Sequence, residues 1–568
     1  MKLTSLYNNG ISSVVLIGTL LQINATLADP SKFVPEPKAD LASTERTALS
    51  VVSNQAPIAN SDGNTGNTDN GEGTPIGINL NGVADWSTEL PFVDVFKTAR
   101  KWDSQREGAS FGQGGALNLT PDGNVASFQP GQYASTLVLD NGGYYPVGQY
   151  VLLYDGQGKL EVGFAGTIVS QSPGRMVVKV VKNESGVRIT LRETNPANPV
   201  RNIRFLMPGT EKTYQTQPFY QGFLDRLAPF KVLRFMDWGG TNGSPLKNWS
   251  ERTTPTSYSQ HTDKGVALEY MIQLANAVQA DPWFTMPHQA TDDYVRQFAT
   301  MVRDRLDPSL KVHIEYSNEV WNGAYGFGQS GYAQQKGVEQ GLSSKADLMA
   351  GERFYAKRSV EVFKIWQDVF GSNKRLIRTI AWQAVNPSSA ESVLKWNDTY
   401  KKADQYAIAP YFNAGKFMEA DNLHTTLKAT PDQVIEAMRQ DIRKINEFVV
   451  ANAKLTKKYG LRLVAYEGGQ DLSAHWVPSD QEKQLNDLFL AASRSPRMRD
   501  VYSEYLNQWK ASGGGLLNQF NDVSAYLKWG HWGLLEYQDQ PINTAPKYQG
   551  VMDFIKANPT KRSKKMKQ

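Results

Sequence analysis

Short apolar runs that end in polar residues recur along most of the chain, separated by longer amphipathic segments. Eight of these runs are rich in β-branched or aromatic residues and predict strands, whereas the 3.6-residue periodicity between them predicts helices. Strands that alternate with helices form a parallel sheet. Eight such units favour a closed (β/α)8 TIM barrel of the α/β class, with a doubly wound open sheet as the alternative. The eight strands begin near residues 78, 231, 282, 311, 376, 404, 461 and 515.

Residues 103–205 do not follow this rhythm. Short alternating runs, such as Tyr133 to Leu139, succeed one another without a helical period between them. Turn-forming pairs such as Asn141-Gly142 separate the runs. The pattern predicts a β-sandwich-like domain inserted after the first barrel strand. Such a domain would either bind sugar or buttress the mouth of the barrel.

The two ends of the chain carry signals of their own. Residues 1–28 combine Lys2, a short apolar core and small residues up to Ala28, as a secretory signal peptide does; a membrane-anchored start is the alternative. Residues 29–75 are rich in Asn, Gly, Ser, Thr and Pro and predict a disordered linker. We therefore expect a secreted protein, in the periplasm, at the cell surface or outside the cell. The remaining predicted units are the barrel start at 76–102, the barrel itself at 206–560 and a basic tail at 561–568.

Composition and charge exclude several classes of site. The net charge of +5 comes from the signal segment and the basic tail, so the body is close to neutral, which argues against a nucleic-acid partner. The chain has no cysteine, which excludes disulfides, thiolate zinc sites and cysteine nucleophiles. The six histidines are scattered, so we expect neither a metal nor a cofactor. Outside the signal segment no apolar run is long enough to cross a membrane, and we expect no integral membrane partner.

Two of the predicted strands end in a glutamate. The run from Lys311 delivers Asn318-Glu319 and then Trp321, and the run from Leu461 delivers Glu467, followed by two glycines. Carboxylates at the C-terminal ends of barrel strands face one common site. Two such glutamates are the minimum apparatus of a retaining glycosidase. The Trp321 indole would raise the pKa of Glu319 by desolvation.

This arrangement resembles the large clan of (β/α)8 glycoside hydrolases with an acid/base after strand four and a nucleophile after strand seven. The strand count puts Glu319 and Glu467 at those two places. The resemblance implies that Glu319 is the acid/base and Glu467 the nucleophile. It also implies that Arg234, after strand two, and Tyr411, after strand six, both brace Glu467. Many members carry a His two residues before that Tyr, where this chain has Ala409.

A second resemblance extends over residues 76–555. It is to a family of secreted bacterial proteins that are often labelled glycosidase-like or cellulose-binding, and it supports the fold and the chemistry more than a particular substrate. The segments that carry it are Asn81–Trp86, Leu233–Trp238, Asp292–Arg296 and Glu315–Asn322.

Polar and aromatic residues at the other strand ends complete the predicted site. Asn318 would hold a sugar hydroxyl, whereas Glu315 should be buried or paired rather than act as the acid. Asp85 and Asp237 are the next candidates for catalysis. About half of the strand-end tryptophans, a group that includes Trp382, should line the cleft. The further substrate-binding or supporting candidates are Trp321, His288, Asp237, Trp238, Gln383, Trp476 and Trp532.

The sequence thus predicts a secreted retaining β-glycosidase that cleaves a polysaccharide within its chain by double displacement. Its partner would be the polysaccharide substrate. Two alternatives stay open. One is a non-catalytic carbohydrate-binding or matrix protein on a glycosidase scaffold. The other is transglycosylation by the same residues.

Overall fold

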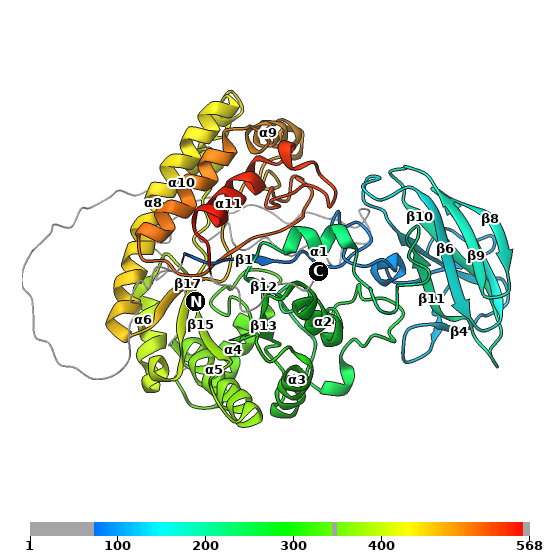
Figure 1. Cartoon of the computed structure of the whole chain (residues 1–568), viewed down its shortest axis with the longest axis horizontal. Helices are drawn as coiled ribbons and strands as arrows, with labels where there is room; N and C mark the ends of the chain where they lie inside the picture. Colours follow the sequence, from blue (N-terminus) through cyan, green and yellow to red (C-terminus); the bar gives the residue numbers. More distant parts are fainter. Residues whose placement is uncertain (1–72, 344–348, 561–568) are drawn as a thin grey trace, which may run out of the picture.

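The centre of the computed structural model is a closed barrel of eight parallel strands (Figure 1). The structure describes residues 73–343 and 349–560. The ring closes because β18 pairs with β1, Leu517 opposite Ile76, so the predicted TIM barrel is confirmed and the open sheet is wrong. In ring order the strands are β1 (Ile76–Asn79), β12 (Val232–Arg234), β13 (Asp281–Met286), β14 (Val312–Tyr316), β15 (Leu376–Ala381), β16 (Gln405–Ile408), β17 (Arg462–Ala465) and β18 (Leu517–Gln519).

The predictions for the two chain ends lie outside the described residues. This applies to the signal segment 1–28, to the linker 29–75 except residues 73–75, and to the basic tail 561–568. In the two described ranges, no helix is both long enough and apolar enough to cross a membrane.

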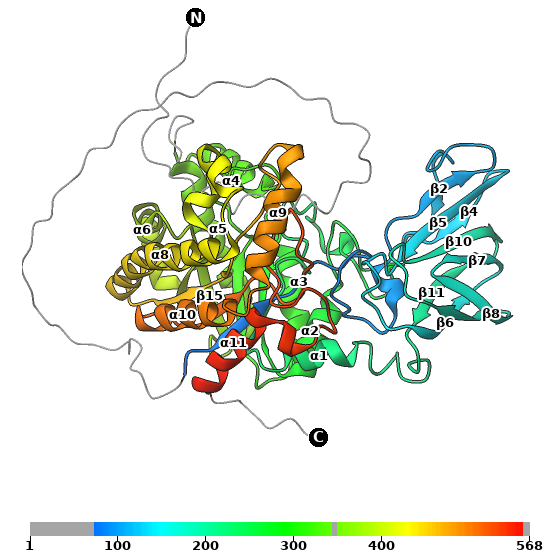
Figure 2. The same ribbon diagram turned by 90° about the horizontal axis from the view of Figure 1, so that it is seen from above.

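Helices follow most barrel strands and surround the barrel (Figures 1 and 2). Their ends follow the sequence signals: Thr430 caps α8 by accepting a hydrogen bond from the Gln433 amide, and Gly460 ends it in the left-handed conformation. The helices are α1 (Gln221–Leu227), α2 (Leu268–Val278), α3 (Asp292–Arg305), α4 (Gly328–Glu339), α5 (Met349–Phe370), α6 (Pro387–Lys395), α7 (Leu423–Thr426), α8 (Pro431–Tyr459), α9 (Ser479–Ser493), α10 (Met498–Ala511) and α11 (Pro546–Ala557). Short 3-10 turns are η3 (Val95–Thr98), η4 (Trp249–Glu251), η5 (Trp396–Lys402), η6 (Gly415–Met418), η7 (Ala420–Asn422) and η8 (Ile542–Thr544).

The barrel wall separates two apolar layers. Successive strand residues point to opposite sides of a sheet. In β13, Phe284 accordingly joins the outer cluster with helix residues such as Trp366, whereas its neighbour Trp283 joins the inner cluster with Ala407 and Val464. Apolar side chains therefore fill the centre of the barrel interior, and polar groups lie at the strand ends.

The strands between β1 and β12 form the inserted domain, whose apolar core also includes residues of η3. Its two antiparallel four-stranded sheets share one apolar core that includes Leu152, Val178 and Ile189, and the domain lies to one side of the barrel (Figures 1 and 2). This confirms an insertion after the first strand. One sheet has the order β2 (Asp103–Arg106), β5 (Gln132–Val138), β10 (Val187–Thr194), β7 (Gly158–Phe164); the other has β11 (Arg201–Leu206), β6 (Gly148–Asp155), β9 (Arg175–Val180), β8 (Gly166–Ser172); β3 (Asn118–Leu119) and β4 (Val125–Ser127) form a small ribbon.

Polar and aromatic contacts join the inserted domain to the barrel. The Arg100 guanidinium donates to Asp85, in the loop after β1, and to Asp140 in the sandwich, both at 2.6 Å. The rings of Tyr144 and Tyr537 stack with their centroids 4.3 Å apart. Burial raises the pKa of Asp85 to about 7, although Arg100 opposes this shift. Asp85, a secondary candidate for catalysis, is thus engaged in joining the two domains.

Candidate active site

Glu319 and Glu467 meet at one end of the barrel. They follow β14 and β17, the fourth and seventh strands of the ring. The C-terminal ends of the strands in a parallel barrel lie at one end of it. The Tyr466 hydroxyl donates to Glu319 Oε1 at 2.8 Å, although Tyr466 is the chain neighbour of Glu467. The two carboxyl groups therefore share one site, as the sequence predicted.

Arg234 holds this site together from the end of β12. It is fully buried, and its Nη1 donates to Glu467 Oε2 and to Asn79 Oδ1, both at 3.1 Å. Its Nη2 donates to Glu315 Oε2 at 2.9 Å and to Asn318 Oδ1 at 2.8 Å. Arg234 thus connects the residue before Glu319 with Glu467 itself. The predicted contact between Arg234 and Glu467 is confirmed.

Glu315 is buried and paired, as expected from its place inside β14. Besides Arg234, the Trp283 indole donates to its Oε2 at 2.8 Å. Burial raises the pKa of Glu315, and Arg234 and Trp283 lower it. The single positive charge of Arg234 is therefore shared between Glu315 and Glu467, so it does not neutralise Glu467 alone.

Among the described residues, the Glu319 carboxyl group has only neutral hydrogen-bond donors. Besides Tyr466, the Asn322 amide donates to its Oε2 at 2.9 Å. The residue is 5 % exposed, and its backbone has a φ of 41°, in the left-handed region that non-glycine residues seldom occupy. Burial raises the pKa of Glu319 to about 7, while the two hydrogen bonds lower it. A carboxyl group that keeps its proton near neutral pH suits a general acid.

Glu467 is 2 % exposed, and the charges of Glu319 and Arg234 both affect its pKa. Burial raises its pKa, repulsion by Glu319 raises it further, and Arg234 lowers it. Two buried carboxyl groups that repel each other titrate as a pair. Ionisation of one member therefore raises the pKa of the other.

Tyr411 does not make the predicted hydrogen bond to Glu467, and the tyrosine that donates in the site is Tyr466, to Glu319. We expected the Tyr411 hydroxyl to reach Glu467, but it has no hydrogen-bond partner among the described residues, and the ring packs edge-on against Phe520 at 6.2 Å. The contact is wrong because the loop after β16 directs the ring towards the end of β18. Tyr411 still lies near the pair: burial and then the charge of Glu467 raise its pKa.

Sequence reasoning missed Tyr466 for a physical reason. Alternation along a strand would turn Tyr466 away from the site if Glu467 faces it. However, β17 ends at Ala465, and the chain bends at Tyr466 and Glu467, so both side chains reach the interior. The bend has no signal in the local sequence.

Two of the strand-end tryptophans belong to the core. Trp238 is fully buried, with its ring stacked on Phe223 of α1 at 6.2 Å, because the turn after β12 directs it towards that helix. Trp382 is buried on Tyr355 at 5.1 Å. Both therefore belong to the buried half of these tryptophans, and Trp238, a predicted substrate-binding or supporting residue, packs in the core.

The other candidates surround the barrel end in varied environments. Trp321, Trp476, Gln383 and Asp237 are half-buried. The negative charge of Asp237 helps to raise the pKa of Glu467, which places Asp237 beside the pair.

His288 and Trp532 are buried at the same end. Burial lowers the pKa of His288 to about 4, so its ring is neutral, and it lies edge-on to Tyr332 at 5.2 Å. Trp532 donates to Asp471 Oδ1 at 3.0 Å and packs against Phe520. Both residues therefore pack against aromatic neighbours at this end of the barrel.

A second pair of carboxyl groups, Glu89 and Asp522, was not predicted. The main-chain N–H of Asn81 donates to Glu89 Oε2 at 2.9 Å and to Asp522 Oδ1 at 3.2 Å. Burial and the neighbouring Asp522 raise the pKa of Glu89 well above its ordinary value, and burial raises that of Asp522 to about 6. The pair anchors the loop after β1.

Among residues 73–343 and 349–560, no group of three or more His, Asp or Glu is arranged to hold a metal ion.

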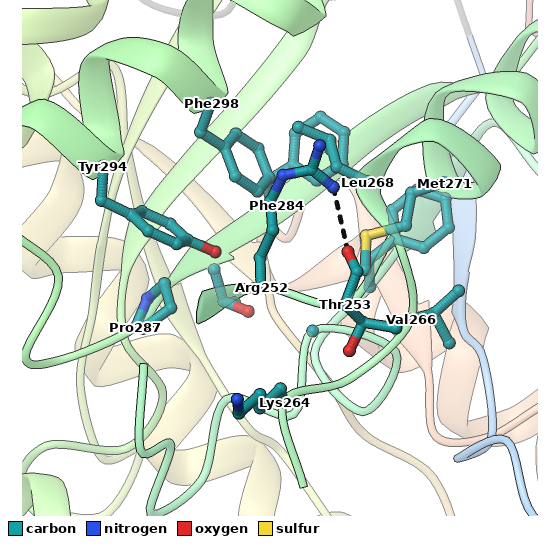
Figure 3. A pocket seen from close by; sticks show the side chains of 13 residues that line it. Arg252, Thr253, Lys264, Val266, Leu268, Met271, Phe284, Pro287, Tyr294 and Phe298 are labelled. Carbon is teal, nitrogen blue, oxygen red and sulfur yellow. Dashed lines mark hydrogen bonds between the residues drawn. The ribbon is translucent and has the colours of Figure 1, made fainter. Parts of the chain in front are cut away.

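The cavity in Figure 3 is separate from the glutamate pair. It lies between the ends of β12 and β13 and the helices α2 and α3, and neither Glu319 nor Glu467 lines it. Its lining is mostly apolar, with Arg252 and Lys264 as the charged members. Its main ring-bearing residues are Phe235, Phe284, Tyr294 and Phe298.

Comparison with known proteins gives remote structural similarities. No protein-family model and no curated protein matches the sequence. One similar solved structure is a GH51 arabinofuranosidase from Xanthomonas axonopodis pv. citri, with 13 % identity and a TM-score of 0.37. The match covers 54 % of this chain and 61 % of the arabinofuranosidase, so the chain spans about three fifths of that protein.

Two further structures come from clostridia. A GH5-4 broad-specificity endoglucanase from Clostridium acetobutylicum has 12 % identity and a TM-score of 0.34, over 61 % of this chain and 92 % of that one. An endo-1,4-beta-D-xylanase from Clostridium thermocellum, with CBM22-1 and GH10 modules, has 10 % identity and a TM-score of 0.35, over 84 % of this chain and 99 % of that one. All three are described as glycoside hydrolases. The fold and the site rest on the barrel topology and contacts of this chain itself.

Replacement of Arg234 tests whether the site depends on its charge. Arg234→Met leaves Glu315 and Glu467 buried without a cation, so the free energy of unfolding should fall by about 3–5 kcal/mol. Urea unfolding followed by circular dichroism measures this. The matched control is Arg378→Met on β15, where Arg378 pairs with the partly exposed Asp404 at 2.7 Å. The control should lose about 0–1 kcal/mol. Equal losses in the two variants would contradict the central role of Arg234.

Proposed function

We propose that this protein is a secreted retaining β-glycosidase that hydrolyses a polysaccharide at bonds within its chain. The observation that carries the proposal is the pair Glu319 and Glu467, after the fourth and seventh strands, with Arg234 bonded to only one of the two. The signal-like segment 1–28 supports secretion.

The proposed charge assignment follows from the donors that each carboxyl group meets. Glu467 receives a charge-assisted hydrogen bond from Arg234, whereas Glu319 receives bonds from a phenol and an amide. A cation stabilises the ionised form of a carboxyl group more than neutral donors do. On the basis of these donors, Glu319 is the proposed acid and Glu467 the proposed nucleophile, whose negative charge Arg234 stabilises.

The reaction then proceeds in two displacements. Glu319 gives its proton to the glycosidic oxygen while Glu467 attacks the anomeric carbon, so the sugar–oxygen bond breaks and a glycosyl ester forms. Glu319, now ionised, takes a proton from water, whose oxygen attacks the same carbon and releases Glu467. Two inversions restore the original β configuration. No cofactor takes part in this sequence.

The low exposure of both glutamates favours a second function. At 5 % and 2 % exposure they offer little surface to a substrate. A carbohydrate-binding or matrix protein without turnover would keep such a buried network as structural support.

Hydrolysis of a panel of β-linked polysaccharides distinguishes the two functions. A glycosidase releases reducing ends, and one that cuts within the chain lowers the viscosity before many ends appear. Proton NMR of the first product should show the β-anomer. Longer products at high substrate concentration would indicate transglycosylation by the same residues. Binding of the panel without release of any reducing end supports the matrix protein.

Alanine variants of the two glutamates should give products of opposite configuration in azide. Glu319→Ala should retain the first step on an aryl glycoside, whose leaving group departs without an acid. Azide then replaces the unactivated water and gives a β-glycosyl azide. In Glu467→Ala, azide attacks once from the vacated side and gives the α-product. NMR of the isolated azides identifies each. Exchanged configurations would reverse the roles of the two residues.

Removal of the Tyr466 hydroxyl should move the alkaline limb of the pH–kcat/KM profile. That limb follows loss of the Glu319 proton, near pH 7 in the free enzyme. The Tyr466 hydrogen bond lowers the pKa of Glu319, so in Tyr466→Phe the limb should move to higher pH. Tyr505→Phe is the control, because it loses a buried hydrogen bond to the Pro410 carbonyl and none to either glutamate. A limb that stays in place or moves to lower pH would contradict the assignment of the acid.

A further inference from the structure

A groove of about 290 Å³ follows the junction between the inserted domain and the barrel. On the sandwich side its lining comes from η3 and β11, with Lys97 and Arg204. On the barrel side it comes from residues 255–258 and from α2, with Tyr270 and Gln273. The chain segment 214–218, between the two domains, completes it. None of the residues assigned to catalysis lines this groove.

Two cations of the groove have unused hydrogen-bonding capacity. Lys97 Nζ lies 5.0 Å from the centroid of the Tyr270 ring, and the Arg204 guanidinium lies 5.8 Å from that of Tyr214. The nearest carboxylate oxygens are 3.9 Å from each cation, beyond hydrogen-bond distance. Within the described residues, neither cationic group donates a hydrogen bond.

The two nearby carboxylates are engaged by other donors. Asp94 is buried and accepts hydrogen bonds from the Phe96 amide at 3.2 Å and from the Phe205 amide at 2.8 Å. Asp155 accepts from the Asn202 amide at 2.7 Å. Both amides donate to Asp94 Oδ1, whereas Lys97 Nζ lies 3.9 Å from Asp94 Oδ2. Because the 3.9 Å separations exceed hydrogen-bond distance, Lys97 and Arg204 keep N–H donors for an anion that enters the groove.

The aromatic side of the groove is fixed in advance. Tyr270 packs edge-on against Phe92 at 5.2 Å, and Tyr258 stacks on Trp102 at 6.1 Å. The Tyr258 hydroxyl also donates to the Arg100 carbonyl at 3.2 Å. Both rings are half-buried, so each keeps part of its surface for a ligand. Rings held in place by the core lose little freedom when a ligand binds.

A register shift lies in β11, the strand that carries Arg204. The pairing of β11 with β6 shifts register between Arg201 and Arg204, and Asn202 has a φ of 50°. A β-bulge, which produces such a shift, bends a strand and changes the direction of its side chains. In this strand the consecutive residues Asn202, Ile203 and Arg204 all line the groove, which regular alternation would not allow.

We propose that this groove binds an acidic oligosaccharide segment, one that carries carboxylate or sulfate groups, at a distance from the bond that is cleaved. Lys97 and Arg204 would bind the anionic groups, and the tyrosine rings would contact the sugar faces. The choice of a glycan as the ligand rests on the proposed function. The position of the groove gives the inserted domain a role in holding the polymer.

Dextran and its charged derivatives test this binding with one common backbone. Isothermal titration calorimetry of the full chain uses size-fractionated dextran, carboxymethyl dextran and dextran sulfate at fixed ionic strength. We expect the charged forms to bind and dextran itself to bind at least tenfold more weakly. A preference for one charged form identifies carboxylate or sulfate as the recognised group. Equal affinity for neutral dextran overturns the proposal.

Matched charge variants locate the binding site. Lys97→Met with Arg204→Met should reduce affinity for the preferred charged form at least tenfold. The control, Lys364→Met with Lys483→Met, removes the same charge from side chains that are 72 % and 86 % exposed on α5 and α9. It should bind like the wild type. The basic segment 561–568 is present in both, so its contribution cancels. Equal losses in the two variants overturn the groove as the site.

A milder variant tests the groove in case the double charge variant does not fold. Gln273 is exposed on α2 and lines the groove, so Gln273→Glu adds a negative charge there without disturbing the core. It should weaken binding of the charged dextran, whereas Lys364→Met, with the same change in net charge, should not. Unchanged binding in Gln273→Glu overturns the proposal.

The experiments can reject the groove as a binding site and the proposed function independently of each other. Groove variants should keep their turnover of a short aryl glycoside, and Glu467→Ala should lose turnover but keep the affinity for charged dextran. Absence of any hydrolysis, with charged dextran still bound at the groove, would remove the proposed function and leave this site. Hydrolysis without binding at the groove would do the reverse.

Discussion

The structure depends on one buried cation, the guanidinium of Arg234. A guanidinium has five N–H donors in a rigid plane. All five meet acceptors here: Nε and Nη2 bond to Glu315, Nη2 also to Asn318, and Nη1 to Asn79 and Glu467. These partners come from the ends of β1, β14 and β17. A lysine has three donors around a point charge and could not link the same three strand ends.

The same constraint gives the two glutamates different chemistry. Since Arg234 also neutralises Glu315, its charge is insufficient for every carboxyl group in the barrel end, and burial raises the pKa of each of them. The direct contact of Arg234 with Glu467 and the neutral donors on Glu319 then give the two carboxyl groups different hydrogen-bonding environments. The asymmetry that the proposed double displacement requires would thus arise from the way strand two meets strands four and seven.

The inserted domain uses its cations in a different way. Arg100 is hydrogen-bonded to Asp85 and Asp140 and so holds the domain on the barrel. Lys97 and Arg204 rest over tyrosine rings, with their nearest carboxylates beyond hydrogen-bond distance. Arg100, whose N–H groups are hydrogen-bonded, holds the two domains together. Lys97 and Arg204, whose cationic groups donate no hydrogen bond within the described residues, are the cations of the proposed binding groove at the same junction.

The sequence by itself determined the barrel, the insertion and the places of Arg234, Glu319 and Glu467. These follow from strand-like runs and from the rule that strand ends share one face, so local pattern is sufficient. Only the tertiary structure decided which side chains meet beyond the strands. The bend after β17 brings Tyr466 to Glu319, the loop after β16 turns Tyr411 towards Phe520, and the turn after β12 buries Trp238 against α1. A loop's path depends on packing against distant segments, and no residue within the loop specifies that packing.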